Sequence, residues 1–275
     1  MMEYGRLTGL KPEEFQHPGE VYYMKALKSI PLLDKIISEV MQAGSEWQDK
    51  SDTTGNNCRI TDRTNPRVYR LYQKALERLD MPKEYPLYSK LEYEYNAMTV
   101  GTKNPFIFIH TSCLDDYTDG EILRTLGHEL GHIKCQHVLY HSVASSLNAI
   151  AASLGIIGTG VMQTIGLALA NWTRCSEFTA DRAGLIACGE VDSCQICFRR
   201  AMGGSTDIKG MNYSMDKVLA QADDFDMETA DIIGKLLYAG YTMSARHPWT
   251  VQRLRQINDW YQSGEYEEIV RRHVG

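Results

Sequence analysis

The chain has 275 residues, of which 43% are hydrophobic and 23% are charged, and its formal net charge is −6. These values are typical of a soluble globular protein with a sizeable core, and they argue against a disordered, collagen-like or coiled-coil chain. The negative charge supplies no strong basic field, so we expect no nucleic-acid partner.

The cysteines and the amino terminus indicate a reducing compartment. The seven cysteines form an odd and scattered set, which is not the pattern of a secreted disulfide framework. The segment MMEYGRLTGLKPEEF at the start is of mixed polarity and lacks the apolar stretch of a signal peptide. We therefore expect a cytoplasmic location.

Residues 1–80 are predicted to form a helical region that packs on a core of residues 81–275, with one compact domain overall. Pro18 and Pro31 stand near two helix starts, and the apolar residues between Ile30 and Met41 recur at helical spacing. A turn-rich stretch follows, which could be a loop or a hinge, and then another helical pattern. These two segments are Ser51–Pro66 and Pro66–Asp80.

From Tyr85 to His110 the composition shifts toward Tyr, Val, Ile and Phe, which favours short β-strands. Helical periodicity returns at Glu121, and Thr118, three residues before it, predicts an N-terminal capping box. The pattern predicts an α+β fold that is mostly helical, with a short mixed or antiparallel sheet. The three expected strands are Leu87–Glu92, Ala97–Val100 and Pro105–His110.

The segment between Lys134 and Arg174 contains no Lys, Arg, Asp or Glu. Its part from Ser142 to Asn171 is moderately apolar, whereas a membrane-spanning helix needs about 20 predominantly apolar residues. Asn148, Gln163 and a group of glycines interrupt this part. We predict a buried or surface-dipping hairpin of two helices here, with peripheral membrane contact through 142–171 as the alternative.

The candidate chemistry lies in the helix that follows the strands, in the motif His128-Glu129-Leu-Gly-His132. Residues four apart project from one helical face, so both imidazoles can reach one tetrahedral zinc ion at about 2.0–2.1 Å. Glu129 follows the first histidine and is the expected general base. A solvated surface helix is the alternative, but an apolar stripe indicates packing against a core. This stripe consists of Ile122, Leu126, Leu130 and Ile133.

Gly127 precedes this motif and Gly131 lies within it, and a helical glycine costs about 1 kcal/mol relative to alanine. They suggest that something approaches the backbone closely, and a packing reason is the alternative. A catalytic zinc ion also needs a third protein ligand. Glu177 and Asp181 are four residues apart, so that one carboxylate can bind zinc while the other accepts the second N–H of a liganding imidazole. A solvated pair of acids is the alternative.

This constellation resembles the gluzincin zinc metallopeptidases of the CAAX prenyl protease and HtpX-like group. The resemblance covers roughly Leu87 to Ile257. Met98 stands where that group has an aromatic residue, and its long membrane spans are not evident. Four ordered motifs carry the resemblance: Asn96-Ala97-Met98, Gly127-His128-Glu129-Leu130-Gly131-His132, Glu177-x-x-x-Asp181, and Arg246-His247-Pro248 with Arg253.

The resemblance implies a zincin-type core and a zinc endopeptidase that hydrolyses peptides or unfolded proteins with a zinc-activated water. An extended substrate would add as a strand to the first motif. The implied site has the zinc ligands His128, His132 and Glu177, the base Glu129, the outer carboxylate Asp181, the substrate strand Asn96, Ala97 and Met98, and the oxyanion donors His247 and Arg253.

Two other functions stay open from the sequence: a zinc-binding or chaperone-like protein with little turnover, and a protease that works at a membrane surface. His247 could also occupy the open zinc position and hold the enzyme latent. The oligomeric state is open as well.

Two further groups are expected to serve packing. His137 and His141 lie further along the helix than one metal ion could reach, so we expect solvated or core histidines. Cys188, Cys194 and Cys197 could be half of a zinc site or a redox pair. No second ligand pair follows them, so a core role in a continuing helix is expected.

Overall fold

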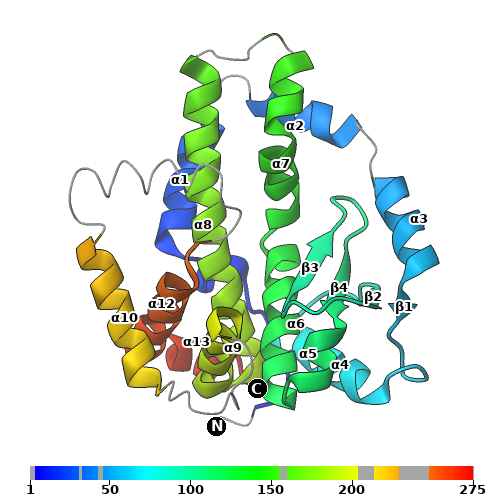
Figure 1. Ribbon diagram of the computed structural model, residues 1–275, viewed down its shortest axis with the longest axis vertical. Helices are drawn as coiled ribbons and strands as arrows, with labels where there is room; N and C mark the ends of the chain where they lie inside the picture. The colour runs from blue at the N-terminus through cyan, green and yellow to red at the C-terminus, as the bar shows by residue number, and fades with distance from the viewer. Residues whose placement is uncertain are drawn as a thin grey trace.

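The computed structural model describes residues 4–30, 33–42, 46–153, 155, 160–203, 214–228 and 248–274. Within these ranges the chain is mostly helical and contains one small sheet (Figure 1). The helices are η1 (Pro12–Glu14), α1 (Pro18–Lys28), α2 (Leu33–Gln42), α3 (Glu46–Asn56), α4 (Pro66–Arg78), α5 (Thr111–Asp116), α6 (Asp119–Lys134), α7 (His137–Ser153), α8 (Gly160–Cys188), α9 (Val191–Gly203), α10 (Met215–Glu228), α12 (Thr250–Gln262) and α13 (Glu265–His273).

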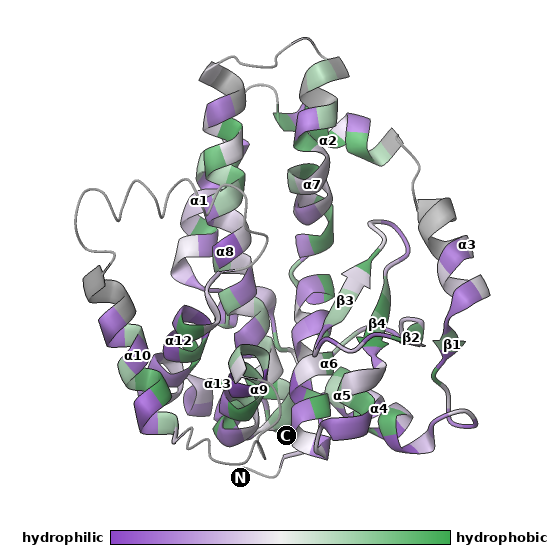
Figure 2. Cartoon of the chain, viewed as in Figure 1, coloured by the Kyte–Doolittle hydropathy of each residue, from purple (hydrophilic) through white to green (hydrophobic). Residues whose placement is uncertain are grey.

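The sheet is mixed, as expected, and lies beside α6 (Figure 1). Its strand order is β1-β2-β4-β3, with β2 parallel to β4 and the other two pairs antiparallel. The central strand β4 is mostly buried and is coloured hydrophobic in Figure 2. In this order β3 is an edge strand. The strands are β1 (Cys58–Arg59), β2 (Leu87–Lys90), β3 (Ala97–Val100) and β4 (Phe106–His110).

The prediction of a loop or hinge at Ser51–Pro66 is wrong for the first part of that stretch, where the structure has the end of α3 and then β1. The sequence of α3 has no apolar stripe to reveal a helix. Side chains hold its last turn instead, because Asn56 donates to Asp52 at 2.6 Å and Asn57 donates to the carbonyl of Thr53 at 3.2 Å. The helix, the three strands and the capping box predicted between Pro66 and Glu121 are confirmed to within a few residues.

The apolar residues form two clusters. The larger cluster joins the start and the end of the described chain, from Tyr4 to Val270, with β2, β4, α4, α6, α9 and α12. The smaller cluster lies where α1 and α2 pack against α7 and α8. Its buried members are Leu27, Leu33, Ile36, Val143, Leu147, Ile165, Leu169 and Trp172.

The smaller cluster confirms the hairpin predicted for residues 142–171, because α7 and α8 stand side by side and bury an apolar face against α1 and α2 (Figure 1). Hydrophilic residues are interspersed with hydrophobic ones along both helices (Figure 2). None of the helices in the described ranges combines the length and the apolar character that crossing a bilayer requires.

The expected close approach at the glycines of α6 is explained by α8, which packs along α6. A Cβ atom at Gly131 would lie 2.6 Å from the Cβ of Ala183 and 3.3 Å from the Cα of Ala180. One at Gly127 would collide with Ala187 in the same way. Small residues on both helices therefore let the two backbones approach closely enough for side chains of α6 and α8 to share one site.

The two ends of the described chain meet at the base of the molecule (Figure 1). Leu7 and Val274 form an isolated antiparallel bridge. His273 bonds to the carbonyl of Thr8 at 2.8 Å and to the carboxylate of Glu14 at 2.9 Å. These contacts close the N-terminal segment against α13.

Candidate metal centre

Three buried side chains from α6 and α8 converge on one point. The Nε2 atoms of His128 and His132 lie 3.1 Å apart. Each is 3.5 Å from a different carboxylate oxygen of Glu177, whose side chain is 1% exposed. In the part of the chain that the structure describes, these three residues are the group of His, Cys, Asp and Glu side chains that could hold a metal ion.

The spacing of these atoms fits a small tetrahedral cation. In a tetrahedral site with bonds of about 2.0–2.1 Å, two ligand atoms lie roughly 3.3–3.4 Å apart. The observed separations of 3.1, 3.5 and 3.5 Å are close to that value. Two imidazoles and one carboxylate are also a ligand set that leaves one position open for water.

Asp181 supports His128 from α8, one turn beyond Glu177. Its Oδ1 atom lies 3.0 Å from the Nδ1 atom of His128. Because a carboxylate accepts, the Nδ1–H of His128 donates, and in the neutral ring the lone pair on Nε2 faces the convergence point. Arg253 donates to both oxygens of Asp181 at 2.8 and 2.6 Å, and Arg124 donates at 2.5 Å.

The two guanidinium groups keep Asp181 ionised. Burial alone would raise the pKa of Asp181, but the charges of Arg253 and Arg124 and the hydrogen bonds from Arg253 and His128 outweigh it and hold the pKa well below its ordinary value. The buried negative charge is therefore compensated, as buried ions require. Arg124 was not singled out from the sequence, although it precedes His128 by four residues and so shares its helical face.

His132 is supported on the other side by His137, which the sequence did not predict. The two Nδ1 atoms lie 3.0 Å apart, and Nε2 of His137 lies 3.1 Å from a carboxylate oxygen of Glu20 in α1. His137 is fully buried, so of the two expected alternatives, a solvated or a core histidine, the structure shows the core histidine. The expectation that α6 continues through it is wrong. Gln136 has a φ of 60° and separates α6 from α7.

Burial and hydrogen bonds together set the charge of the groups on this side. It disfavours the charged imidazole and lowers the pKa of His132 well below its usual value, which suits a neutral ligand. Burial alone would raise the pKa of Glu20, but hydrogen bonds from His137, Thr179 and Gln16 outweigh it and lower the pKa. Glu20 is therefore a carboxylate at neutral pH.

Glu129 is buried next to His128 and is held by the edge strand β3. The hydroxyl of Thr99 donates to its Oε2 atom at 2.7 Å and lies 3.2 Å from its backbone carbonyl. Thr99 carries no sequence signal of its own beyond its place after the Asn96-Ala97-Met98 motif. The contact joins that strand to the carboxylate expected to act as base.

The comparison with known families decides which class of protein carries this centre. The model of peptidase family M48 matches residues 62–261, most of the chain. The chain belongs to peptidase family M48. M48 peptidases are metal-dependent hydrolases, which agrees with the buried group of two histidines and a glutamate.

A curated relative of this M48 chain is the plastoglobule-localized metallopeptidase 48, chloroplastic, of Arabidopsis thaliana. It is 27% identical over 265 residues, which cover 96% of this chain and 76% of the relative. No solved structure matches the chain. The relative therefore supports the same metallopeptidase class across almost the whole chain, including residues before 62.

The remaining candidate site residues of the M48 chain are placed as follows. Arg253, expected over the cleft, has its guanidinium against Asp181 and lies 3.4 Å from an oxygen of Glu177. Met98 is 45% exposed on β3, and the side-chain oxygen of Asn96 accepts the backbone N–H of Ala97 at 2.9 Å. His247 and Arg246 lie outside the described residues.

The cysteine group packs in the core. Cys188, Cys194 and Cys197 are buried, and the first two sulfur atoms are 3.7 Å apart. None of the three belongs to a metal-binding group within the described ranges. The expectation of a continuous helix here is wrong, because Gly189 has a φ of 76° and separates α8 from α9.

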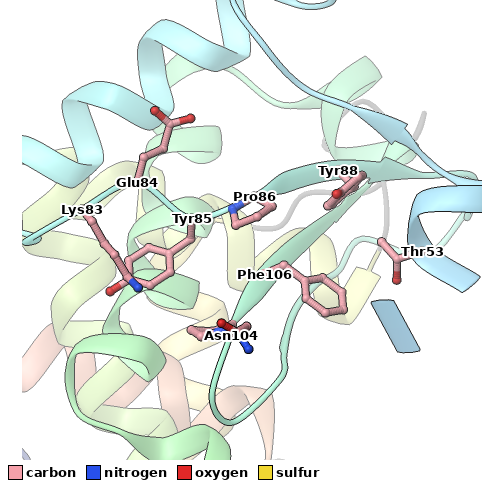
Figure 3. A pocket seen from close by; sticks show the side chains of 9 residues that line it. Thr53, Lys83, Glu84, Tyr85, Pro86, Tyr88, Asn104 and Phe106 are labelled. Atoms are coloured by element: carbon pink, nitrogen blue, oxygen red, sulfur yellow. The ribbon is translucent and has the colours of Figure 1, made fainter. Parts of the chain in front are cut away.

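A hollow of about 160 Å³ opens where β2 and β4 begin, with Thr53 of α3 on its wall. Figure 3 shows the rings of Tyr85 and Phe106 lining it, and the ammonium of Lys83 lies 5.4 Å from the centre of the Tyr85 ring. Its lining shares no residue with the metal centre. We therefore assign it no part in the candidate chemistry.

Proposed function

We propose that the chain is a zinc-dependent endopeptidase. The observation that carries the proposal is the convergence of His128, His132 and Glu177 at tetrahedral spacing, with Glu129 buried beside them. The three residues would hold the ion. A bound zinc ion supplies a Lewis acid that polarises the scissile carbonyl and makes the attacking water more acidic.

Glu129 would take up the proton of that water and deliver it to the leaving amine, so that it acts first as base and then as acid. Thr99 donates to one carboxylate oxygen of Glu129, which restrains the side chain beside the metal centre. His128 and His132 would present unprotonated Nε2 atoms, because their Nδ1 atoms face hydrogen-bond partners.

The substrate would be an extended peptide or an unfolded protein segment that adds to β3. In the sheet order β3 pairs with β4 alone, so its other edge is available to a further strand within the described structure. Strand addition uses backbone hydrogen bonds along Asn96, Ala97 and Met98 and binds residues on both sides of the cleaved bond. Such binding suits an internal peptide bond rather than a chain end.

The contacts of Arg253 favour a role in fixing Asp181 and Glu177. Its expected role as an oxyanion donor together with His247 stays a prediction, as does latency through His247. Membership of the CAAX prenyl protease and HtpX-like group, a cytoplasmic location and membrane contact through 142–171 likewise remain predictions.

The decisive experiment pairs zinc content with peptidase activity. We expect one zinc ion per chain, chelator-sensitive cleavage of casein or a quenched fluorescent peptide, and a loss of about 10²–10⁴-fold in kcat for Glu129→Gln with its zinc content unchanged, because a positioned acid–base group contributes that much. Glu77→Gln, an exposed change on α4, is the matched control and should behave as wild type.

Two outcomes would contradict the proposal. Full activity of Glu129→Gln would remove the assigned base. Zinc-loaded wild-type protein that binds unfolded casein without cleaving it would favour the chaperone-like alternative.

A further inference from the structure

Glu20 is an acid buried in a helix that lies outside the segment matched by the family model. Its side chain is 3% exposed, and a buried carboxylate is stable only when it is well hydrogen-bonded. Gln16 donates to it at 3.0 Å, the hydroxyl of Thr179 donates to its second oxygen, and Nε2 of His137 lies 3.1 Å from the first. Glu20, in α1, is therefore bonded at once to the segment that precedes α1, to α7 and to α8.

His137 reaches His132 because the helix breaks between them. In a continuous helix, residues five apart do not share a face. The positive φ of Gln136 ends α6 and starts α7, which turns the ring of His137 toward His132. The rings lie edge to face with centroids 5.2 Å apart, and both nitrogens of His137 have a partner.

The proton positions along this chain follow from its two ends. Glu20 can only accept, so Nε2 of His137 donates to it. A metal ion on Nε2 of His132, the atom that faces Glu177 and His128, leaves the proton of that ring on Nδ1. Nδ1 of His132 then donates, and Nδ1 of His137 accepts.

We propose that Glu20 and His137 are positioning residues of the metal centre, which fix the tautomer and the ring orientation of His132 through the chain Glu20–His137–His132. The inference rests on the proposed metal binding. It brings α1 into the site, where the backbone N–H of His17 also donates to Thr179 at 2.9 Å, two residues beyond Glu177. Such outer partners typically change metal affinity about 10–100-fold.

The test uses two identical substitutions at neighbouring histidines. His137→Phe keeps a ring but removes the acceptor for His132. His141→Phe leaves His137, and with it that acceptor, in place. The ring of His141 also contacts His132, but its Nε2 atom bonds to the hydroxyl of Ser176 at 2.9 Å. We expect the zinc Kd, measured by chelator competition, to rise about 10–100-fold in His137→Phe and to stay within about threefold of wild type in His141→Phe.

Two further variants separate positioning from packing. His137→Asn places an amide oxygen near the position of Nδ1, so it should recover part of the lost zinc affinity. The amide of Glu20→Gln can either accept from His137 or donate to it, so it no longer fixes the proton of His137 on Nε2. This variant should raise the zinc Kd by about 10-fold. The visible spectrum of the cobalt(II)-loaded protein should change in His137→Phe and return toward wild type in His137→Asn, which a purely structural role would not produce.

The outcomes are distinct. Equal zinc affinities of His137→Phe and His141→Phe, or no recovery in His137→Asn, would overturn the chain of hydrogen bonds while leaving the peptidase proposal intact. Urea unfolding of the metal-free variants checks folding, and if His137→Phe does not fold, His137→Asn and Glu20→Gln decide. A wild-type protein that takes up no zinc would overturn the proposed function and this link together.

Discussion

The two imidazoles of the metal centre are supported in opposite ways. His128 donates directly to Asp181, a carboxylate fixed by two buried guanidinium groups from α6 and α12. His132 faces a second imidazole, and the carboxylate of Glu20 stands one residue further away. The same requirement, a lone pair aimed at the ion, is met by an ionic cluster on one side and by a chain of imidazoles on the other.

The difference predicts unequal losses of stability and metal affinity when a residue on either side is mutated. Removing one member of a buried ionic cluster leaves other charges uncompensated, whereas cutting the imidazole chain leaves a neutral ring without an acceptor. The ionic side should therefore govern both folding stability and metal affinity. The imidazole side should govern mainly metal affinity.

The largest effect is expected for Asp181→Asn. It leaves Arg124 and Arg253 buried without their shared counter-charge, so the free energy of unfolding of the metal-free protein should fall by about 3–5 kcal/mol. Urea unfolding measures this. Asp119→Asn, which breaks an exposed ion pair with Arg67 near the start of α6, is the control and should cost less than about 1 kcal/mol. Similar values for both variants would refute the ionic description of this side.

The pH dependence of the same pair has a defined sign. Because the folded pKa of Asp181 lies below its unfolded value of about 3.9, the carboxylate stabilises the fold above that pH and loses its contribution as the pH falls. The stability difference between wild type and Asp181→Asn should therefore be constant near neutrality and shrink below about pH 4. A difference that grows on acidification would contradict the assignment.

A smaller effect tests the close packing of α6 and α8, the two helices that position the metal centre. Gly131→Ala places a methyl group 2.6 Å from the Cβ of Ala183, so α8 must shift away from α6 and carry Glu177 with it. We expect a loss of stability of about 1–3 kcal/mol, together with weaker zinc binding. Gly166→Ala, in the same helix as Glu177, meets an atom of Leu147 at 3.8 Å and should be neutral or stabilise by up to about 1 kcal/mol. If the Gly166 variant bound zinc more weakly and the Gly131 variant did not, the distance between α6 and α8 would not control zinc binding.

The residues that the sequence predicted for this site share a local origin. His128 and His132 are predicted because a spacing of four residues places side chains on one helical face. The same spacing pairs Glu177 with Asp181, and the resemblance to the gluzincin peptidases implies that Glu177 is the ligand and Asp181 the outer carboxylate. The structure brings His128, His132 and Glu177 together. Arg124 could have been predicted by the same spacing, since it precedes His128 by four residues.

The missed residues depend on tertiary packing. Glu20 and His137 meet His132 only because Gln136 adopts a positive φ and because α1 packs against α8. Neither event has a sequence signal, since Gln is not a residue that favours this conformation. Thr99 reaches Glu129 through the pairing of β3 beside α6. The helix α3 was missed because its polar sequence lacks a periodic apolar face.

The smallest effect is expected far from the metal, where His273 joins the two ends of the chain. Both partners of its ring, the carbonyl of Thr8 and the carboxylate of Glu14, only accept, so the ring must carry two protons to satisfy them. Burial would lower the pKa of His273, but these bonds outweigh it and raise the pKa. A histidine with a raised folded pKa stabilises the protein below the unfolded pKa of about 6.5, and this contribution is lost at higher pH.

His273→Gln should therefore lower the free energy of unfolding by less than about 1 kcal/mol near pH 5.5, because the pair lies near the surface. The loss should be still smaller near pH 8.5. The zinc affinity of this variant should equal that of wild type. A rise in zinc Kd comparable to that of His137→Phe would show that the ends of the chain are coupled to the metal centre. The outer partners of the metal centre would then no longer differ from the rest of the molecule.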